Sequence, residues 1–528
     1  MIFKNKISSV LYFSSFLCVV IFNQSCEKTT EDIADQPNIV FILADDLGYG
    51  DLGSYNENSL IPTPNLDRLA SEGISLTNAY CPVSVCSPTR YSLMTGSYPW
   101  RSWNKSGVMR NYERSMMAKD QLTLPQMLQQ NGYETAGFGK WHLGTSFPTL
   151  DGNKPDGHGM FYAENNGANI DFSKPVYDGP VDHGFDHWLG FSCASECWIL
   201  DGKQIVGALD HDYYTIEAAS NTENLEMIPM EDYLPLITKK SLKFLQRQME
   251  NQKPFFLYFS PYVPHTPFSP GENFKGTTEA GIYGDYVCEL DNAIGKILSA
   301  LDDLDLNENT IVMFASDNGS AYEVAFKGME DSDARNRLGG HPIDINKYPL
   351  KDTIYTNGEK AHYPNGILKG TKQTAWEGGV RTPFIARWPN KFPAGEISDQ
   401  LFALNDVMPS IAGILEFELS EAEALDGYNL LQVLKGEKEG LRKSVVIQSS
   451  NNIFGLRMDN WKFIDASNQE SADAIDELYD LSKDPSESNN LIESNPDVAK
   501  MMKHELFRLM NSKSSNSIGY DKNIPMED

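Results

Sequence analysis

The stretch CSPTRYSLMTG, residues 86–96, places a cysteine two residues before a proline and four residues before an arginine, and it ends in Thr-Gly. A second stretch, GYETAGFGKWHLG, follows at residues 132–144. Two stretches this specific are not expected to occur by chance in this order and at this spacing.

Around these stretches, apolar runs alternate with helical patterns. The continuous apolar character of the runs is typical of buried strands in a sheet that is covered on both faces. We expect strands at 38–43, 74–80, 135–141, 255–260 and 310–315. We expect helices at 64–72, 124–130, 233–249 and 286–301. Helices that alternate with apolar strands predict an α/β fold with a large, mostly parallel sheet flanked by helices.

The pattern changes after a predicted helix at 405–415. Short strands and a terminal helix are then expected, at 444–448, 454–458, 461–464 and 498–510. We therefore predict a large domain at 37–420, which contains both stretches quoted above, and a smaller C-terminal α+β subdomain at 421–528. Within the first, the polar segment 320–365 is expected to be an insertion, because connections of that length are usually functional or mobile.

The first 26 residues have the features of an export signal. Lys4 and Lys6 precede an apolar run that is too short, and too interrupted by serine, for a membrane span. Cys26 fits a bacterial lipoprotein signal, in which it would carry a lipid anchor. Plain secretion stays open, because Asn23 matches that signal poorly. The chain is thus expected to be exported, as a periplasmic protein or as an outer-membrane or surface lipoprotein.

The composition excludes several classes of partner. The chain carries 44 Lys and Arg against 73 Asp and Glu, a net charge of −29. Such a protein is not expected to bind nucleic acid or anionic membranes non-specifically, although a local site can still accept an anionic substrate. Seven cysteines in 528 residues are too few for a disulfide scaffold. In an oxidising compartment, Cys193 and Cys197 could still pair.

Two predicted strands end in side chains that offer hard oxygen ligands. Asp45-Asp46 follows the strand at 38–43, and Asp317-Asn318 follows the strand at 310–315. Adjacent buried carboxylates repel each other unless a cation neutralises them, and oxygen ligands alone favour Ca²⁺ or Mg²⁺ over zinc. The alternative is that these residues only cap turns.

The stretches at 86–96 and 132–144 resemble the two signatures of the sulfatase family. The first matches at its Cys, Pro, Arg and Thr-Gly positions, and the second at Gly-Tyr, Thr and the Gly-Lys-Trp-His-Leu-Gly core. The resemblance extends from residue 37 to about 490 and includes HGFD at 183–186, PHTP at 264–267 and WEGG at 376–379. It is nearest to the arylsulfatase A and N-acetylgalactosamine-6-sulfatase branch, and it implies an alkaline-phosphatase-like fold.

The resemblance implies a modified nucleophile and a metal ion. In this family a maturation enzyme converts the signature cysteine, here Cys86, to formylglycine, and the hydrated aldehyde attacks sulfur. The oxygen ligands at the two strand ends fall where the family keeps calcium; they are Asp45, Asp46, Asp317 and Asn318. The resemblance implies the modified Cys86 as a further ligand of the metal. Calcium is expected rather than magnesium.

The resemblance assigns the other catalytic roles to Arg90, Lys140, His142, His265 and Lys372. Lys140 and Lys372 would contact the sulfate, and Arg90 would steady the hydrated aldehyde and the metal side. His142 would accept the proton of the hydrate during elimination of sulfate. His265 would donate a proton or a hydrogen bond to the leaving alcohol.

Several other residues are weaker candidates. Lys369 competes with Lys372 for the sulfate, and His183 is expected to orient a turn. Side chains that could line the substrate pocket are His211, His341, His362, Arg335, Arg337 and Asp344. Tryptophans that could stack on sugars, although core packing is favoured, are Trp100, Trp103 and Trp188.

The sequence therefore predicts an exported sulfatase that hydrolyses sulfate esters, with a sulfated carbohydrate as substrate. One alternative is a phosphate or phosphonate monoester hydrolase of the same superfamily. A non-enzymatic alternative is a glycan-binding protein with an unmodified site, which the competent residue types at every assigned position disfavour.

Overall fold

The computed structural model describes residues 36–161, 166–193, 197–210, 225–251, 253–327, 329, 360–468 and 474–516. The predicted signal at 1–26, with Cys26, and most of the insertion at 320–365 lie outside these ranges. So do His211, Arg335, Arg337, His341 and Asp344. No helix among the described residues combines the length and the apolar character needed to cross a membrane.

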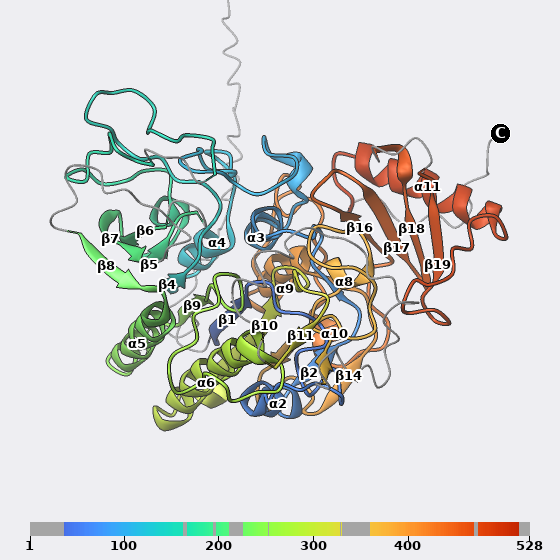
Figure 1. The fold of residues 1–528 in the computed structure, drawn as a ribbon, viewed down its shortest axis with the longest axis horizontal. Coiled ribbons are helices and arrows are strands. Elements are labelled where there is room, and N and C mark those ends of the chain that lie inside the picture. The colour runs from blue at the N-terminus through green and yellow to red at the C-terminus, as the bar shows by residue number, and fades with distance from the viewer. Residues whose placement is uncertain are drawn as a thin grey trace, which may run out of the picture.

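A large mixed sheet forms the centre of the molecule (Figure 1). Its core is a run of neighbouring parallel strands, in the order β10 (Thr310–Ser316), β1 (Asn38–Ala44), β9 (Phe255–Ser260), β4 (Glu134–Gly139) and β5 (His187–Phe191). Strand β1 is buried along nearly its whole length, which explains its continuous apolar sequence.

Both edges of this sheet include antiparallel pairs. Beyond β10 lie β13 (Phe384–Arg387), β2 (Ile74–Leu76) and β14 (Glu396–Ser398). Beyond β5 lie β6 (Trp198–Asp201), β7 (Gln204–Asp210) and β8 (Glu226–Pro229). Strand β13 is antiparallel to both of its neighbours, and so is β6. The predicted mostly parallel α/β sheet is confirmed.

Helices cover both faces of the sheet. Alternate residues of β1 point to opposite faces, so Val40 and Ile42 join one apolar core and Ile39 and Phe41 another. The first core includes α2 (Pro64–Ser71), α5 (Met230–Gln248) and α6 (Gly281–Asp303). The second includes α3 (Cys86–Thr95), α4 (Leu124–Gln130), α9 (Val407–Ile414) and α10 (Leu431–Leu434).

A second, smaller sheet follows in the C-terminal part of the chain, drawn orange to red in Figure 1. It is an antiparallel meander of β16 (Ser444–Gln448), β17 (Phe454–Met458), β18 (Trp461–Ile464) and β19 (Glu477–Asp480). Helix α11 (Pro496–Asn511) packs Met502 and Leu506 against Leu456 and Phe463 of this sheet. The smaller C-terminal α+β unit is confirmed, while its limit at 420/421 stays a prediction.

Two of the expected elements are divided in the structure. The strand predicted at 74–80 is divided into β2 and β3 (Ala79–Tyr80), because the polar pair Thr77-Asn78 leaves the main sheet and β3 pairs with β15 (Phe402–Ala403). The helix predicted at 405–415 begins as a 3-10 turn, η4 (Leu404–Asp406), before α9.

The remaining elements are short. Strands β11 (Ala325–Phe326) and β12 (Ala361–His362) pair near the two ends of the predicted insertion. Helix α8 (Glu377–Val380) follows the insertion. The other 3-10 turns are η1 (Pro99–Arg101), η2 (Pro180–His183), η3 (Asn307–Asn309) and η5 (Ala466–Asn468).

Candidate active site

The two pairs of oxygen ligands meet at one edge of the large sheet. Strands β1 and β10 are parallel and in register, with Ala44 opposite Ser316, so the residues that follow leave the sheet side by side. The backbone N–H of Asp317 donates to the Ala44 carbonyl at 3.1 Å, and that of Asp46 to the Asp317 carboxylate at 3.3 Å. This is the edge at which open α/β sheets carry their ligand sites.

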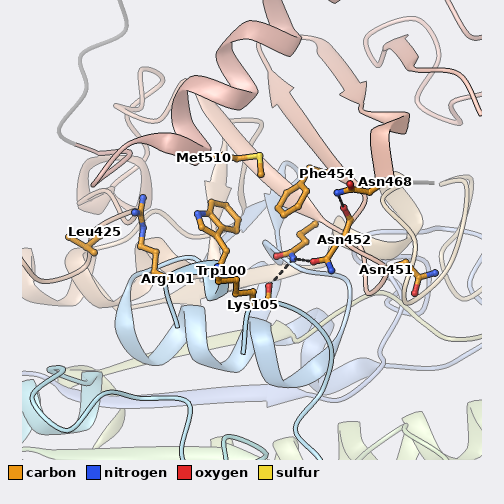
Figure 2. A pocket seen from close by; sticks show the side chains of 10 residues that line it. Trp100, Arg101, Lys105, Leu425, Asn451, Asn452, Phe454, Asn468 and Met510 are labelled. Atoms are coloured by element: carbon orange, nitrogen blue, oxygen red, sulfur yellow. Dashed lines mark hydrogen bonds between the residues drawn. The ribbon is translucent and has the colours of Figure 1, made fainter. Parts of the chain in front are cut away.

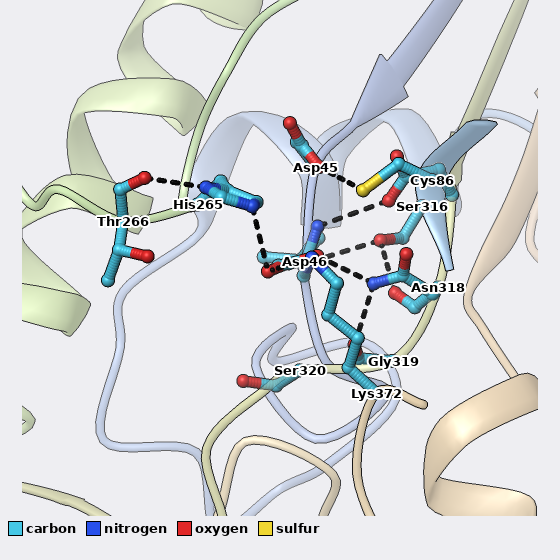
Figure 3. A network of polar contacts seen from close by, with 12 residues as sticks. Asp45, Asp46, Cys86, His265, Thr266, Ser316, Asn318, Gly319, Ser320 and Lys372 are labelled. Atoms are coloured by element: carbon cyan, nitrogen blue, oxygen red, sulfur yellow. Dashed lines mark hydrogen bonds and ion pairs between the residues drawn. The ribbon is translucent and has the colours of Figure 1, made fainter. Parts of the chain in front are cut away.

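The side chains of Asp45, Asp46, Asp317 and Asn318 form what we call the acidic cluster. Cys86 lies next to this cluster, at the first position of the buried helix α3. Its thiol donates to the Asp45 carboxylate at 3.6 Å (Figure 3). Cys86, Asp45, Asp46 and His265 each offer a potential ligand atom within 4.8 Å of the others. Burial raises the pKa of the Cys86 thiol to about 12, so the unmodified side chain is a thiol at neutral pH and a poor nucleophile.

Arg90 lies one helical turn after Cys86 and joins the ends of three strands. It donates to the Asp317 carboxylate at 2.8 and 3.0 Å, to the Ser260 hydroxyl at 2.6 Å and to the Lys140 carbonyl at 3.1 Å. The side chain is fully buried. The sequence analysis did not identify Ser260; the available signal was its place at the end of the predicted strand 255–260.

Two lysines bring positive charge to the acidic cluster. The Lys140 amine, which follows β4, lies 2.6 Å from the Asp45 carboxylate. The Lys372 amine lies 2.7 Å from Asp46 (Figure 3). Burial alone would lower the pKa of Lys372, but the Asp46 and Asp45 carboxylates outweigh it and raise that pKa well above its usual value. Both lysines are therefore cationic in the folded protein.

The competing lysine, Lys369, points to the C-terminal sheet. Its amine lies 4.3 Å from the centre of the Trp376 ring and donates to the Tyr479 hydroxyl at 3.1 Å and to the Glu487 carbonyl at 3.2 Å. Of these two candidates, only Lys372 is placed at the acidic cluster.

The two predicted catalytic histidines are held as neutral rings. Nε2 of His142 donates to the Met109 carbonyl at 3.1 Å, and its buried Nδ1 has no partner among the described residues. Burial, with the nearby Lys140 and Arg90, holds the pKa of His142 well below its usual value. The unpartnered Nδ1 is therefore a free proton acceptor.

His265 lies beside the acidic cluster. Its Nδ1 donates to the Thr266 carbonyl at 2.6 Å, and its Nε2 faces the Asp46 carboxylate at 3.8 Å. Burial, followed by the charge of Lys372, lowers the pKa of His265 to about 4. In this tautomer Nε2 is an acceptor, so donation from Nε2 requires the imidazolium. The predicted role of His265 in leaving-group protonation stays a prediction.

The donor set at the two strand ends fits a hard divalent cation. Asn318 uses its amide N–H₂ on the Asp46 carboxylate at 2.7 Å and on the Gly319 carbonyl at 3.0 Å, which leaves its buried Oδ1 without a partner among the described residues. Burial and the neighbouring Asp45 carboxylate raise the pKa of Asp317 to about 6. A bound cation would be coordinated by the Asn318 amide oxygen, which then has a partner. It would also offset the repulsion between the neighbouring Asp45 and Asp317 carboxylates.

The segment that carries Lys372 is anchored by a buried ionic cluster that the sequence analysis did not identify. The Lys462 amine of β18 lies 2.8 Å from the Glu377 carboxylate and 3.4 Å from Glu487, and all three side chains are fully buried. Glu377 also accepts from the Tyr80 hydroxyl at 2.8 Å, and its backbone N–H donates to Glu487 at 2.7 Å. The WEGG motif drew attention to Glu377, but nothing in the sequence indicated that Lys462 and Glu487 are its partners.

Other candidates have structural roles in the described part of the chain. His362 is buried and contacts the Asp51 carboxylate at 2.8 Å, so it does not line an open pocket. His183 lies in η2 and contacts Asp178 at 3.2 Å. Trp188 is buried in the core. The Cys193 thiol donates to the Met109 carbonyl at 3.5 Å and is not bonded to Cys197.

Comparisons with known proteins identify the family of this chain. The family model "Sulfatase" matches residues 37–417, and the model "N-sulphoglucosamine sulphohydrolase, C-terminal" matches residues 370–513. An N-acetylgalactosamine-6-O-sulfatase of Bacteroides thetaiotaomicron is 31% identical over 93% of this chain and 95% of its own length. Bovine arylsulfatase A is 30% identical over 88% of this chain and 85% of its own length.

Solved structures give the same result. A sulfatase structure described under the metabolism of multiple glycosaminoglycans by Bacteroides thetaiotaomicron superposes with a TM-score of 0.73 at 29% identity, covering 90% of this chain and 100% of that one. The fold is thus the alkaline-phosphatase-like α/β fold of these enzymes. The sequence signatures, the fold and the similarity over nearly the full length agree, and the chain belongs to the sulfatase family of sulfuric ester hydrolases.

Proposed function

We propose that this sulfatase is an exported enzyme that removes sulfate esters from sulfated glycans or their oligosaccharides. The observation that carries the proposal is the position of Cys86, at the start of a buried helix and 3.6 Å from the carboxylate of Asp45, with the Lys140 and Lys372 amines on the same acidic cluster. The relative that is similar over 93% of this chain is named for a sulfated amino sugar, which supports a carbohydrate substrate.

The nucleophile requires conversion of Cys86 to formylglycine by a separate maturation enzyme. A thiol with a pKa near 12 is protonated in the folded protein. The hydrated aldehyde supplies a hydroxyl nucleophile and a second hydroxyl through which the sulfate is expelled. The unpartnered Nδ1 of His142 is suited to accept the proton released in that step.

The cationic side chains stabilise the charge that develops on the transferred group. Lys140 and Lys372 are buried or nearly so, and their charges are fixed in position before substrate arrives. Preorganised cations in a site with little water contribute strongly to the stabilisation of a transition state. Arg90 keeps the ends of the strands and the Asp317 carboxylate in place.

Calcium is the cation that we propose for the cluster of Asp45, Asp46, Asp317 and Asn318, next to the modified Cys86. When bound, it polarises the oxygens at the reacting centre. We expect EGTA treatment to lower the melting temperature and millimolar Ca²⁺ to restore it, because a ligand that binds only the folded state stabilises that state. Differential scanning calorimetry measures this directly. A melting temperature that is indifferent to EGTA and Ca²⁺ would contradict a calcium site.

Export is proposed from the sequence at 1–26, with Cys26 as a lipid anchor or with plain secretion. Both alternatives place the enzyme in a compartment where it meets extracellular or periplasmic glycans. The mass of the mature N-terminus distinguishes them, since acylation of Cys26 adds the mass of its lipid chains.

The mass of the Cys86 peptide, combined with turnover of matched esters, tests the proposal. Conversion of Cys to formylglycine lowers the peptide mass by about 18 Da, because the thiol is replaced by an aldehyde. We expect the modified peptide in active enzyme and a kcat/KM for 4-nitrophenyl sulfate above that for 4-nitrophenyl phosphate. Unmodified Cys86 in fully active enzyme would overturn the mechanism. A preference for phosphate would favour the phosphate or phosphonate monoester hydrolase alternative.

A further inference from the structure

A pocket of about 930 Å³ lies between the segment that follows α3 and the C-terminal sheet (Figure 2). Its walls combine aromatic, amide and cationic side chains; they are Trp100, Arg101, Lys105, Leu425, Gln448, Asn451, Asn452, Phe454, Asn468 and Met510. None of these residues belongs to the acidic cluster at Cys86. The mechanism described above therefore leaves the pocket unexplained.

Two aromatic rings form a rigid apolar wall. Trp100 stacks on Tyr98, with ring centres 4.2 Å apart and planes 13° apart. Phe454 meets Trp100 edge to face at 5.7 Å. The Tyr98 hydroxyl accepts from the Val446 backbone N–H at 3.0 Å, which fixes this stack to β16. Large, flat, amphipathic rings of this kind pack well against the apolar faces of sugar rings.

The polar side of the pocket contains unsatisfied hydrogen-bonding atoms. Gln448 is fully buried and uses its amide N–H₂ on the Lys105 carbonyl at 2.9 Å and on Asn452 at 2.8 Å, while its Oε1 has no partner among the described residues. The indole N–H of Trp100 also lacks a partner there. A buried hydrogen-bond acceptor or donor without a partner lowers the stability of the folded protein. The hydroxyl groups of a sugar both donate and accept, so they could pair with Gln448 Oε1 and with the Trp100 indole N–H.

The charge of the pocket is opposite to that of the protein. Arg101 and Lys105 line it, although the chain as a whole carries a net charge of −29. Arg101 is held by the Asp426 carboxylate at 2.6 Å, which balances its charge, so the net positive charge of the pocket comes from Lys105. A sulfated or carboxylated sugar would be repelled by most of the surface and attracted here.

Three backbone connections place the pocket next to the reacting centre. The Ser84 N–H donates to the Gln448 carbonyl at 3.0 Å, and two residues of chain, at most about 7 Å, separate Ser84 from Cys86. The Ser450 N–H donates to the Gln373 carbonyl at 3.3 Å, one residue after Lys372. The segment that begins at Lys105 leads to Met109, whose carbonyl accepts from His142.

We propose that this pocket binds a neighbouring sugar unit of the same sulfated oligosaccharide whose sulfate ester lies at Cys86. The inference rests on the proposed function, because it assumes a glycan substrate. The aromatic wall packs on the sugar ring, Gln448 and the asparagines bind its hydroxyls, and Lys105 binds its anionic substituent. The enzyme then distinguishes an oligosaccharide from an isolated sulfated sugar by this second contact.

Kinetics with two substrates test the pocket. The probes are N-acetylgalactosamine 6-sulfate and a chondroitin 6-sulfate hexasaccharide, with 4-nitrophenyl sulfate to report the chemistry alone. The variants are Phe454→Leu, which removes the ring and keeps an apolar side chain, and the double variant Lys105→Ala/Asn451→Ala, which changes two exposed residues. Lys243→Ala, exposed on α5, is the matched control for loss of one surface charge.

We expect KM for the hexasaccharide to rise about tenfold in each pocket variant and to stay unchanged in the control. Turnover of the monosaccharide and of 4-nitrophenyl sulfate should stay within about twofold of wild type in all of them. Equal changes for the hexasaccharide and the monosaccharide, or none for either, would overturn the pocket assignment. So would a wild-type enzyme that neither binds nor cleaves the hexasaccharide. If the wild-type enzyme turns over none of the three substrates, the proposed function itself is refuted.

Discussion

Replacement of Cys86 by alanine is expected to abolish turnover of sulfate esters while the fold is retained. Alanine has no sulfur to be oxidised, so no aldehyde and no hydroxyl nucleophile can form at this position. The structural cost is small, because the thiol donates one long hydrogen bond, of 3.6 Å to Asp45, in the described part of the chain, and alanine is compatible with the first turn of α3. The measurement is kcat with 4-nitrophenyl sulfate, together with the melting temperature.

Cys81→Ala is the matched control for that prediction. Cys81 is also fully buried close to the site, and its thiol donates to the Val380 carbonyl at 3.2 Å. The same substitution therefore removes a buried thiol without touching the signature cysteine. We expect Cys81→Ala to keep activity within a few-fold of wild type at a similar melting temperature. Turnover near the wild-type rate in Cys86→Ala would refute the nucleophile.

Lys372→Met is expected to lower kcat by on the order of 10²-fold, whereas Lys369→Met should change it by less than about threefold. The two lysines are three residues apart, but only the amine of Lys372 lies on the Asp46 carboxylate. Lys369 instead contacts the Trp376 ring and Tyr479. Methionine keeps the apolar length of the side chain and removes the charge in both variants.

Melting temperatures separate a catalytic loss from a folding loss in this pair. Removing Lys372 leaves Asp46 without its nearest cation, so some loss of stability accompanies the loss of rate. The effect on kcat should persist at temperatures well below both melting transitions. A large drop in kcat for Lys369→Met with Lys372→Met near wild type would reverse the assignment of the two lysines.

The central part of the fold could be predicted because its strands are unambiguous. Strands β1, β9 and β10 are buried on both faces and read as continuous apolar runs. Once these strands are parallel neighbours, the residues after Ala44 and after Ser316 must emerge together, so the meeting of Asp45 and Asp317 follows from the sequence.

Helix α3 could not be recognised by its pattern. All ten of its residues are buried, so it has no polar face and no amphipathic periodicity. Strands β6, β7 and β8, which follow β5 toward one edge of the sheet, were missed for a related reason, since their sequences mix polar and apolar residues and their pairing depends on tertiary context. The choice between Lys369 and Lys372, similarly, depends on the contact of Lys369 with Tyr479, about 110 residues further along the chain.

The buried cluster of Glu377, Lys462 and Glu487 has a consequence for how this enzyme can be divided and recombined. The two family models overlap at residues 370–417, which is the stretch that contains both Lys372 and Glu377. A protein shortened before β18 would lose Lys462, the cation nearest to Glu377, and keep Arg381 at 3.5 Å from that carboxylate. Removing one partner of a buried ion pair costs about 3–5 kcal/mol. The C-terminal sheet is therefore not an interchangeable module. A chimaera that exchanges this sheet between sulfatases must also carry over a matching partner for Glu377, or the segment that presents Lys372 loses its anchor.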